Sequence, residues 1–207
     1  MHINAKEVPG VFKRFGRNAR LQYLAWFVRR GILLENVSQA ELYEALRVTK
    51  LPNVLEMFGF LRVKVFRKAG YLMREIYPER LVSVRLVTTA FANYLVDSLV
   101  DTENNLMDAY TYHDMGDDVT AEANSHTALQ NSREARVSGN QQENGANIYQ
   151  TIATITATAS YTVNEHGLFS ASTSGTMMDR NLVGSPPAVI SDDQVQFTYE
   201  LTVNAES

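Results

Sequence analysis

The side chains best suited to metal binding or acid–base chemistry lie in an acidic run, YHDMGDD, and in its flanks. The carboxylate and imidazole groups of this region are Asp108, His113, Asp114, Asp117, Asp118 and His126. Carboxylate oxygens are the ligands that a hard cation such as Ca²⁺ prefers. However, the EF-hand spacing is absent, and no H-x-x-x-H pair exists for zinc. We therefore expect a solvated acidic loop here and predict no metal and no cofactor.

Two adjacent pairs of charged or titratable residues lie further along the chain. Glu165 and His166 would need a positioned nucleophile or a substrate pocket to act as an acid and a base, and the sequence marks neither. We predict a structural turn at this position. Asp179 and Arg180 are expected to form a local ion pair or to fix the end of a strand.

Motifs of the common enzyme classes are missing. The chain has no cysteine, which excludes disulfides, thiolate metal sites and cysteine nucleophiles. It also lacks the phosphate-binding patterns G-x-x-x-x-G-K-[ST] and G-x-G-x-x-G and the G-x-S-x-G turn of hydrolases. We therefore predict that the protein is not an enzyme.

The carboxyl-terminal part carries the clearest strand patterns. From Val195 to Val203, apolar residues alternate with polar ones, which predicts a strand with one buried and one wet face. Residues 149–163 are rich in Thr, Ile, Val and Tyr, which pack well in sheets. Residues 164–175 are rich in turn formers, and residues 107–147 read as long polar loops with a few short strands.

The amino-terminal part is predicted to be partly helical. Residues 10–31 have the pattern of a basic amphipathic helix, which either packs on its own domain or docks as an arm on an acidic protein surface or on nucleic acid. Ser38 and Glu41 form a capping box, which predicts the start of a second helix. Residues 61–68 alternate like an edge strand with a basic outer face, and residues 69–84 read as a linker with some strand character.

These patterns define a fold class and two regions. We predict an α+β, mainly β fold, in which residues 85–207 form an antiparallel, jelly-roll-like β-sandwich with one packed helix over residues 85–100. Residues 1–84 are predicted to form a basic helical arm or region with a short hairpin.

The sign of the net charge changes near the boundary between these two regions. Residues 1–85 contain 16 Lys and Arg and 7 Asp and Glu, a net charge of +9, whereas residues 86–207 contain 3 and 16, a net charge of −13. Such polarity indicates that the two parts face different surroundings. We expect the basic part to contact carboxylates on a partner. The predicted partner-binding residues are Arg14, Arg17, Arg20, Arg29 and Arg30.

Membranes and nucleic acid are not expected as partners. No apolar run reaches the ~18 residues of a membrane span, and residues 1–10 lack the apolar core of a signal peptide. The signatures of RNA-binding modules are absent from the basic part. We expect a soluble protein that is made in the cytoplasm.

Five segments together resemble an uncharacterised group of tailed-bacteriophage structural proteins. Its members similarly have an E-H-G-(I/L)-F turn, a G-T-(L/M)-(L/M)-D-R strand and a D-x-(I/V)-x-F-T-Y-x-L-T last strand. The run Gly-Ser-Pro-Pro at 184–187 departs from the group, and the first 85 residues are not covered. The segments are LVTTAFANYLVD (86–97), YHDMGDDVTAEANSHTAL (112–129), NEHGLFSAST (164–173), GTMMDRNLV (175–183) and DDQVQFTYELTV (192–203).

The resemblance implies a virion component, assembled in the host cytoplasm, and carries no catalytic residue. Our first hypothesis is a homo-oligomeric capsid decoration, or cement, protein, arranged as a trimer or another symmetric ring, whose basic part grips the shell. The alternative is a neck, tail or fibre-attachment protein. A third hypothesis, a carbohydrate- or metal-dependent enzyme, would need an aromatic platform or a paired-carboxylate cleft, which the sequence does not mark.

Overall fold

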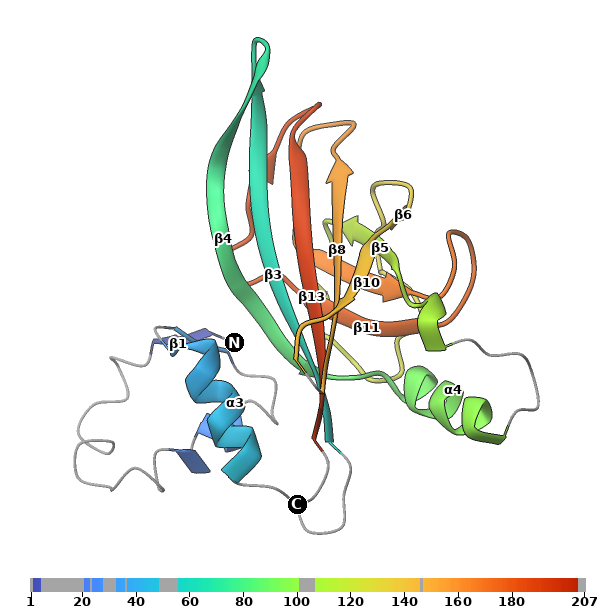
Figure 1. The fold of residues 1–207 in the computed structure, drawn as a ribbon. Helices are drawn as coiled ribbons and strands as arrows, with labels where there is room; N and C mark the ends of the chain where they lie inside the picture. Colours follow the sequence, from blue (N-terminus) through green and yellow to red (C-terminus); the bar gives the residue numbers. More distant parts are fainter. Residues whose placement is uncertain are drawn as a thin grey trace.

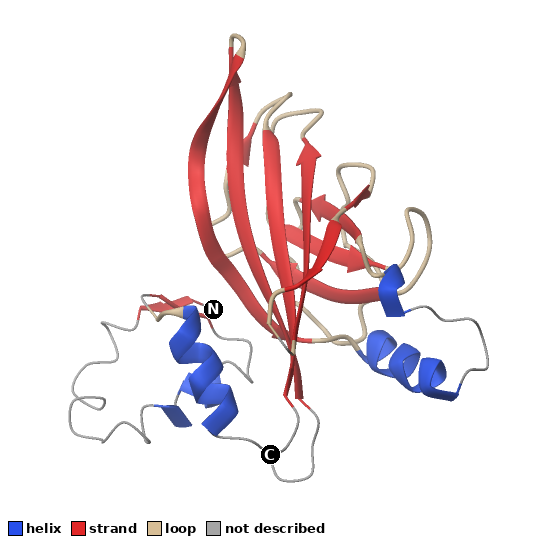
Figure 2. Cartoon of the chain, viewed as in Figure 1, coloured by secondary structure: helices blue, strands red, loops and turns tan. Residues whose placement is uncertain are grey.

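Strands dominate the computed structural model, which describes residues 2–4, 21–22, 24–27, 33–35, 37–48, 56–100, 107–145 and 147–204. The fold is mainly β, and its two large sheets are antiparallel (Figure 1; Figure 2). The mainly β class that the sequence predicts is therefore confirmed.

The larger sheet has five strands in the order β4-β3-β13-β8-β7. The last strand of the chain, β13, lies at its centre, where Phe197 is opposite Val63 of β3 on one side and Ala153 of β8 on the other. The strands are β3 (Glu56–Ala69), β4 (Leu72–Leu86), β7 (Asn140–Glu143), β8 (Ile148–Thr156) and β13 (Gln194–Asn204).

The second sheet has four strands in the order β11-β10-β5-β6. Its strands are β5 (Tyr112–Gly116), β6 (Val137–Ser138), β10 (Glu165–Phe169) and β11 (Met177–Leu182). The remaining elements are the pairs β1 (His2–Asn4) with β2 (Leu33–Glu35) and β9 (Tyr161–Thr162) with β12 (Ala188–Val189), the helices α3 (Gln39–Val48) and α4 (Thr89–Val100), and the 3₁₀ helix η1 (Met107–Ala109).

The two large sheets share one buried core. Val63 and Phe197 of the five-stranded sheet belong to the same apolar cluster as Met115 and Leu168 of the four-stranded sheet. The sheets are also tied at one edge, because Gly184 N donates to Val82 O at 3.0 Å and Thr88 N donates to Met178 O at 2.9 Å. At the other edge, the chain passes from β6 into β7 through a single residue, Gly139. These links fix the sheets relative to each other.

A smaller core lies between the amino-terminal helices and the five-stranded sheet. Phe58, Phe60 and Val84 from β3 and β4 form a buried cluster with Leu24 and Leu46. Residues 21–22 and 24–27 are helical, and Leu21, Leu24 and Ala25 are at most 5% exposed. This described part of the predicted basic helix therefore packs on its own chain.

The predicted capping box starts α3. Glu41 N donates to Ser38 Oγ at 3.2 Å, and Ser38 N donates to Glu41 Oε2 at 3.2 Å. These reciprocal bonds satisfy two amide groups that a helix start leaves without partners. The prediction for this helix is confirmed.

The alternation in β13 holds, but its second face is not wet. Val195, Phe197 and Tyr199 are 0% exposed, as predicted. Glu200 on the opposite face is only 1% exposed, because it accepts hydrogen bonds from neighbouring strands, including one from Arg62 Nη2 at 3.1 Å. Polar partners on neighbouring strands, rather than solvent, satisfy the Glu200 carboxylate on this face.

Three sequence-based assignments of secondary structure differ from the structure. Residues 61–68 are not an edge strand, because β3 lies between β4 and β13. Residues 69–84 are mostly β4, the true edge strand, so the predicted strand character is present but the segment is not a linker; the predicted turn region 164–175 contains β10. The boundary predicted at residue 84 falls inside β4, so the five-stranded sheet spans it.

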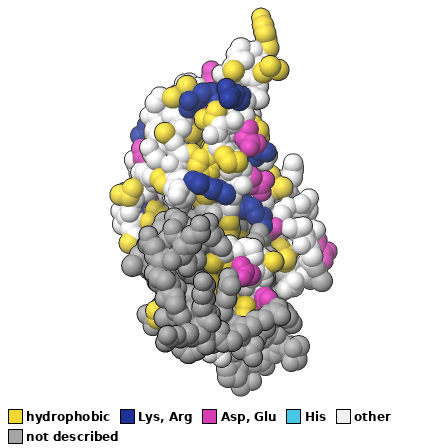
Figure 3. Space-filling model, turned by 90° about the vertical axis from the view of Figure 1, so that its left-hand side faces the viewer, with side chains coloured by type: hydrophobic (Ala, Val, Ile, Leu, Met, Phe, Trp, Pro, Cys, Tyr) yellow, Lys and Arg dark blue, Asp and Glu magenta, His cyan; other side chains and the backbone are white. Residues whose placement is uncertain are grey.

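The β3–β4 hairpin projects beyond the rest of its sheet (Figure 1; Figure 3). Gly70, at φ 64°, makes the turn that an L side chain would strain. We call residues 69–76 the hairpin tip. Its apolar side chains are exposed: Tyr71 107%, Leu72 75%, Met73 41% and Ile76 39%.

Candidate functional site

A buried ion pair joins the neighbouring strands β10 and β11. Arg180 Nε donates to Glu165 Oε2 at 2.7 Å, and the two side chains are 1% and 0% exposed. Taking two charges out of water is costly, so such a pair is stable only when further hydrogen bonds satisfy both partners. The partners come from one long loop, residues 117–133.

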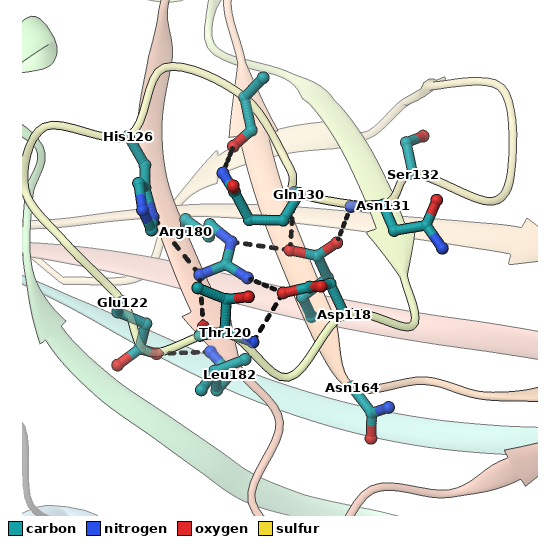
Figure 4. A network of polar contacts seen from close by, with 12 residues as sticks. Asp118, Thr120, Glu122, His126, Gln130, Asn131, Ser132, Asn164, Arg180 and Leu182 are labelled. Atoms are coloured by element: carbon teal, nitrogen blue, oxygen red, sulfur yellow. Dashed lines mark hydrogen bonds and ion pairs between the residues drawn. The ribbon is translucent and has the colours of Figure 1, made fainter.

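The guanidinium of Arg180 contacts the first half of this loop (Figure 4). Its Nη1 donates to Thr120 O at 3.0 Å and lies 3.4 Å from His126 Nδ1, while its Nη2 lies 3.4 Å from Asp118 Oδ1. Hydrogen bonds from Thr120, above all, lower the pKa of Asp118, which keeps this carboxylate charged beside Arg180.

The carboxylate of Glu165 holds the second half of the loop, through Gln130 and Asn131, which Figure 4 labels. Gln130 N donates to Glu165 Oε2 at 3.1 Å, and Asn131 N donates to Oε1 at 2.7 Å. One ion pair on the sheet therefore fixes the loop at both ends. We call this set the loop clamp; its members are Asp118, Thr120, His126, Gln130, Asn131, Glu165 and Arg180.

A pair of histidines lies in the interior, on the other face of the same sheet. His113 Nδ1 and His166 Nε2 are 2.9 Å apart, and His113 Nε2 is 3.2 Å from Thr151 Oγ1. Both rings are 0% exposed, and the His166 ring lies 4.6 Å from the ring of Phe197. Burial lowers the pKa of both groups, that of His113 to about 3. The pair is therefore neutral at physiological pH and packs as part of the core.

Adjacent residues of the predicted pairs point to opposite faces, because side chains alternate along a strand. Arg180 contacts Glu165, whereas Asp179 accepts a hydrogen bond from Tyr199 Oη at 3.1 Å. Glu165 likewise faces the loop, while His166 faces the core. The predicted turn at Glu165 and His166 is wrong, and neither pair forms a shared site.

The acidic run is divided in the same way. His113 and Asp114 are buried in β5 rather than solvated, which corrects the loop prediction. Asp114 Oδ1 accepts from Ser132 Oγ at 2.8 Å, and burial raises its pKa. Asp117 instead accepts from Asn131 Nδ2 at 2.6 Å. Over the described ranges, no three His, Asp or Glu side chains are grouped so that they could hold a metal ion.

The contacts of these groups lie within the protein. The loop clamp saturates a carboxylate and a guanidinium with partners inside the protein. A general acid or base needs a proton-transfer partner on a substrate, and the inward-facing histidines contact each other, Thr151 and aromatic rings instead. The predicted partner-binding residues lie outside the described residues: Arg14, Arg17, Arg20, Arg29 and Arg30.

Comparison with known proteins adds no relative: no family model and no curated protein matches the chain. Among the described helices, none combines the length and apolarity that a membrane crossing requires.

Sequence reasoning singled out Arg180 and His166, and also Glu165 and His113, but it did not predict that Arg180 pairs with Glu165 or that His166 pairs with His113. The only signal was a charged residue inside an apolar strand-forming run, as in MMDRNLV. Nothing in the sequence indicated that apolar side chains are exposed at the hairpin tip.

Proposed function

We propose that this protein is a non-enzymatic structural component of a tailed-phage virion, most simply a capsid decoration protein that stabilises the head. The observation that carries the proposal is the division of labour between interior and surface. The titratable groups of the loop clamp and the histidine pair brace the fold, while four of the eight large apolar side chains that are exposed among the described residues lie on the projecting hairpin, including the two most exposed, Tyr71 and Leu72. Such an arrangement favours adhesion over catalysis. The resemblance of five sequence segments to tailed-phage structural proteins is the reason for placing this role in a phage virion.

The fold supports the same function. Two facing antiparallel sheets with one shared core are compatible with a jelly-roll-like sandwich, which includes β3 and β4 in addition to strands of the predicted region 85–207. Long, internally clamped loops give such a domain a fixed outer surface, which repeated attachment on a particle requires. We propose that copies associate into a symmetric oligomer, since most soluble oligomers are closed homo-oligomers.

Charge supports a gripping role for the amino-terminal part. The first 85 residues carry a net charge of +9. Arginines bind carboxylates with paired hydrogen bonds, so a cluster of them suits an acidic protein surface. We propose that Arg14, Arg17, Arg20, Arg29 and Arg30 make these contacts on a capsid or neck protein.

Copy number in purified particles tests the proposal. Quantitative mass spectrometry against the major capsid protein should find the chain in hundreds of copies if it covers the head. A count of about a dozen or fewer would move it to the neck or tail. Its absence from the particle would refute a virion function altogether.

A binding assay tests the gripping surface separately. Capture of the major capsid protein should weaken when salt screens the contacts, and it should weaken further in Arg29→Glu/Arg30→Glu. Arg133→Glu, in the acidic part of the chain, is the matched control and should bind normally. Binding that neither salt nor the double variant changes would refute the role of the arginines.

A further inference from the structure

The hairpin tip has a layered chemistry that calls for a partner. At its end, Tyr71 and Leu72 are 107% and 75% exposed. Directly behind them, Lys68 pairs with Met73 and Arg67 with Arg74 across the hairpin. Within the described part of the chain, neither Lys68 nor Arg74 has an acidic partner. The tip therefore presents apolar side chains backed by two cations, Lys68 and Arg74, that no described carboxylate neutralises.

Other charged groups of the hairpin are already paired. Arg67 makes paired contacts with Asp193, from Nε to Oδ1 at 3.0 Å and from Nη2 to Oδ2 at 2.7 Å. Lys64 Nζ lies 2.9 Å from Glu75 Oε2. An isolated two-stranded hairpin is marginally stable in water. The Lys64–Glu75 pair joins its two strands, and the Arg67–Asp193 pair holds it against the body of the protein. The tip is thus presented on a fixed support.

A turn with complementary chemistry lies at the same end of the molecule. Ile190 is 45% exposed and Asp192 is exposed, and Asp192 has no cation partner among the residues that the structure describes. Asp193 fixes this turn, since its Oδ2 accepts from Ile190 N at 3.0 Å while the same carboxylate binds Arg67. The tip and the turn are therefore neighbours within one copy, but their exposed groups do not satisfy each other.

We infer that the hairpin tip docks on the Ile190–Asp192 turn of a second copy of this chain, and that the second copy returns the same contact. In a two-fold interface each copy contributes the same surface, so the tip of each copy can contact the turn of the other and the contact forms twice. Leu72 and Tyr71 cover Ile190 of the other copy, and Lys68 or Arg74 meets its Asp192. The inferred contact rests on one part of the proposed function, that copies of the chain associate, and it specifies which surfaces meet.

The test uses the purified full chain and its oligomeric state. Sedimentation velocity over a range of concentrations should show a reversible dimer. Tyr71→Ser/Leu72→Ser removes the apolar end from exposed positions, so it should leave the fold intact and weaken the dimer by about a hundredfold. Val119→Ser, which changes an apolar residue that is 72% exposed in a distant loop, is the matched control and should leave the dimer unchanged.

A charge exchange tests the ionic half of the contact. Lys68→Glu/Arg74→Glu and Asp192→Lys should each weaken the dimer, by roughly fivefold or more, and the combined variant should recover it. Glu143→Gln, an exposed carboxylate on β7, serves as the control.

Cysteine cross-linking identifies the contact directly, because the chain has no cysteine of its own. When Leu72→Cys and Ile190→Cys are mixed under oxidation, a disulfide between the two variants should form. A protein that stays monomeric at all concentrations, or a dimer that survives both the apolar and the charge variants, would overturn the inference. The virion copy number does not depend on either result, so the two proposals fail separately.

Discussion

The loop clamp makes a strong prediction for Glu165→Gln. This substitution keeps the size of the side chain but removes the charge that faces Arg180, which is 3% exposed. It also replaces one carboxylate oxygen with an amide group that cannot accept hydrogen bonds. Glu165 accepts from Arg180 Nε, Gln130 N and Asn131 N, so at least one donor loses its acceptor.

The magnitude follows from this geometry. Breaking a buried ion pair by removing one partner costs about 3–5 kcal/mol, because the remaining charge is left without compensation. Asp118 lies 3.4 Å from Arg180 Nη2 and compensates only in part, since its side chain is 28% exposed. We therefore expect Glu165→Gln to lower the free energy of unfolding by about 3 kcal/mol, near the low end of that range.

A double-mutant cycle separates the pair from its surroundings. Arg180→Met should cost less than Glu165→Gln, because the Glu165 carboxylate keeps its two main-chain donors in the loop. In the combined variant no buried guanidinium remains, so the cost should fall below the sum of the single costs by about 1–3 kcal/mol.

Urea unfolding, followed by circular dichroism, measures these free energies. Hydrogen exchange at Gln130 N and Asn131 N reports on the loop itself and should become faster in both single variants. Glu143→Gln, on the exposed edge, is the control and should change stability by less than about 0.5 kcal/mol. A cost below about 1 kcal/mol for Glu165→Gln, or strictly additive costs, would refute the bracing role.

Three further predictions concern the interior. Burial lowers the pKa of His113 from 6.5 to about 3 and also lowers that of His166, so below pH 6.5 the unfolded chain binds protons that the native state refuses. Stability should fall as the pH decreases from 6.5 towards 3, and thermal unfolding of His113→Gln/His166→Gln should show a shallower pH dependence. Gly59→Ala would place a Cβ against the Tyr199 hydroxyl and should lower the free energy of unfolding in urea by about 1–3 kcal/mol. An unchanged free energy of unfolding would mean that the Tyr199 side chain can move away from β3 at little cost. Phe197→Ala should cost about 3–5 kcal/mol and reduce the yield of soluble protein, and an unchanged melting temperature would contradict its central place in the core.

Local signals in the sequence determined the elements whose patterns are periodic. The alternation around Phe197 and Tyr199 predicted β13 and its buried face, and the Ser38–Glu41 spacing predicted the start of α3. Both succeed because the physical cause is local: side chains alternate along a strand, and a helix start needs acceptors within one turn. The mainly β class follows from the same patterns.

Pairing over long distances in the chain was decided only by the tertiary structure. The alternation in 61–68 predicts a strand but cannot show that β13 covers its second edge, since β3 and β13 are more than 100 residues apart. The sequence also places Glu165 beside His166 and Asp179 beside Arg180, yet the strand geometry turns each pair to opposite faces. Conversely, it separates His113 from His166 by 53 positions, and sheet pairing brings their rings into contact.

The sequence by itself therefore determined which segments form strands and helices and how charge is distributed between the two ends of the chain. Tertiary structure decided which charged groups are buried, which partners satisfy them and which hairpin projects from the body. The reason is physical: periodicity depends on neighbours within a few residues, whereas burial, ion pairing and exposure depend on strands that meet only after the whole chain has folded.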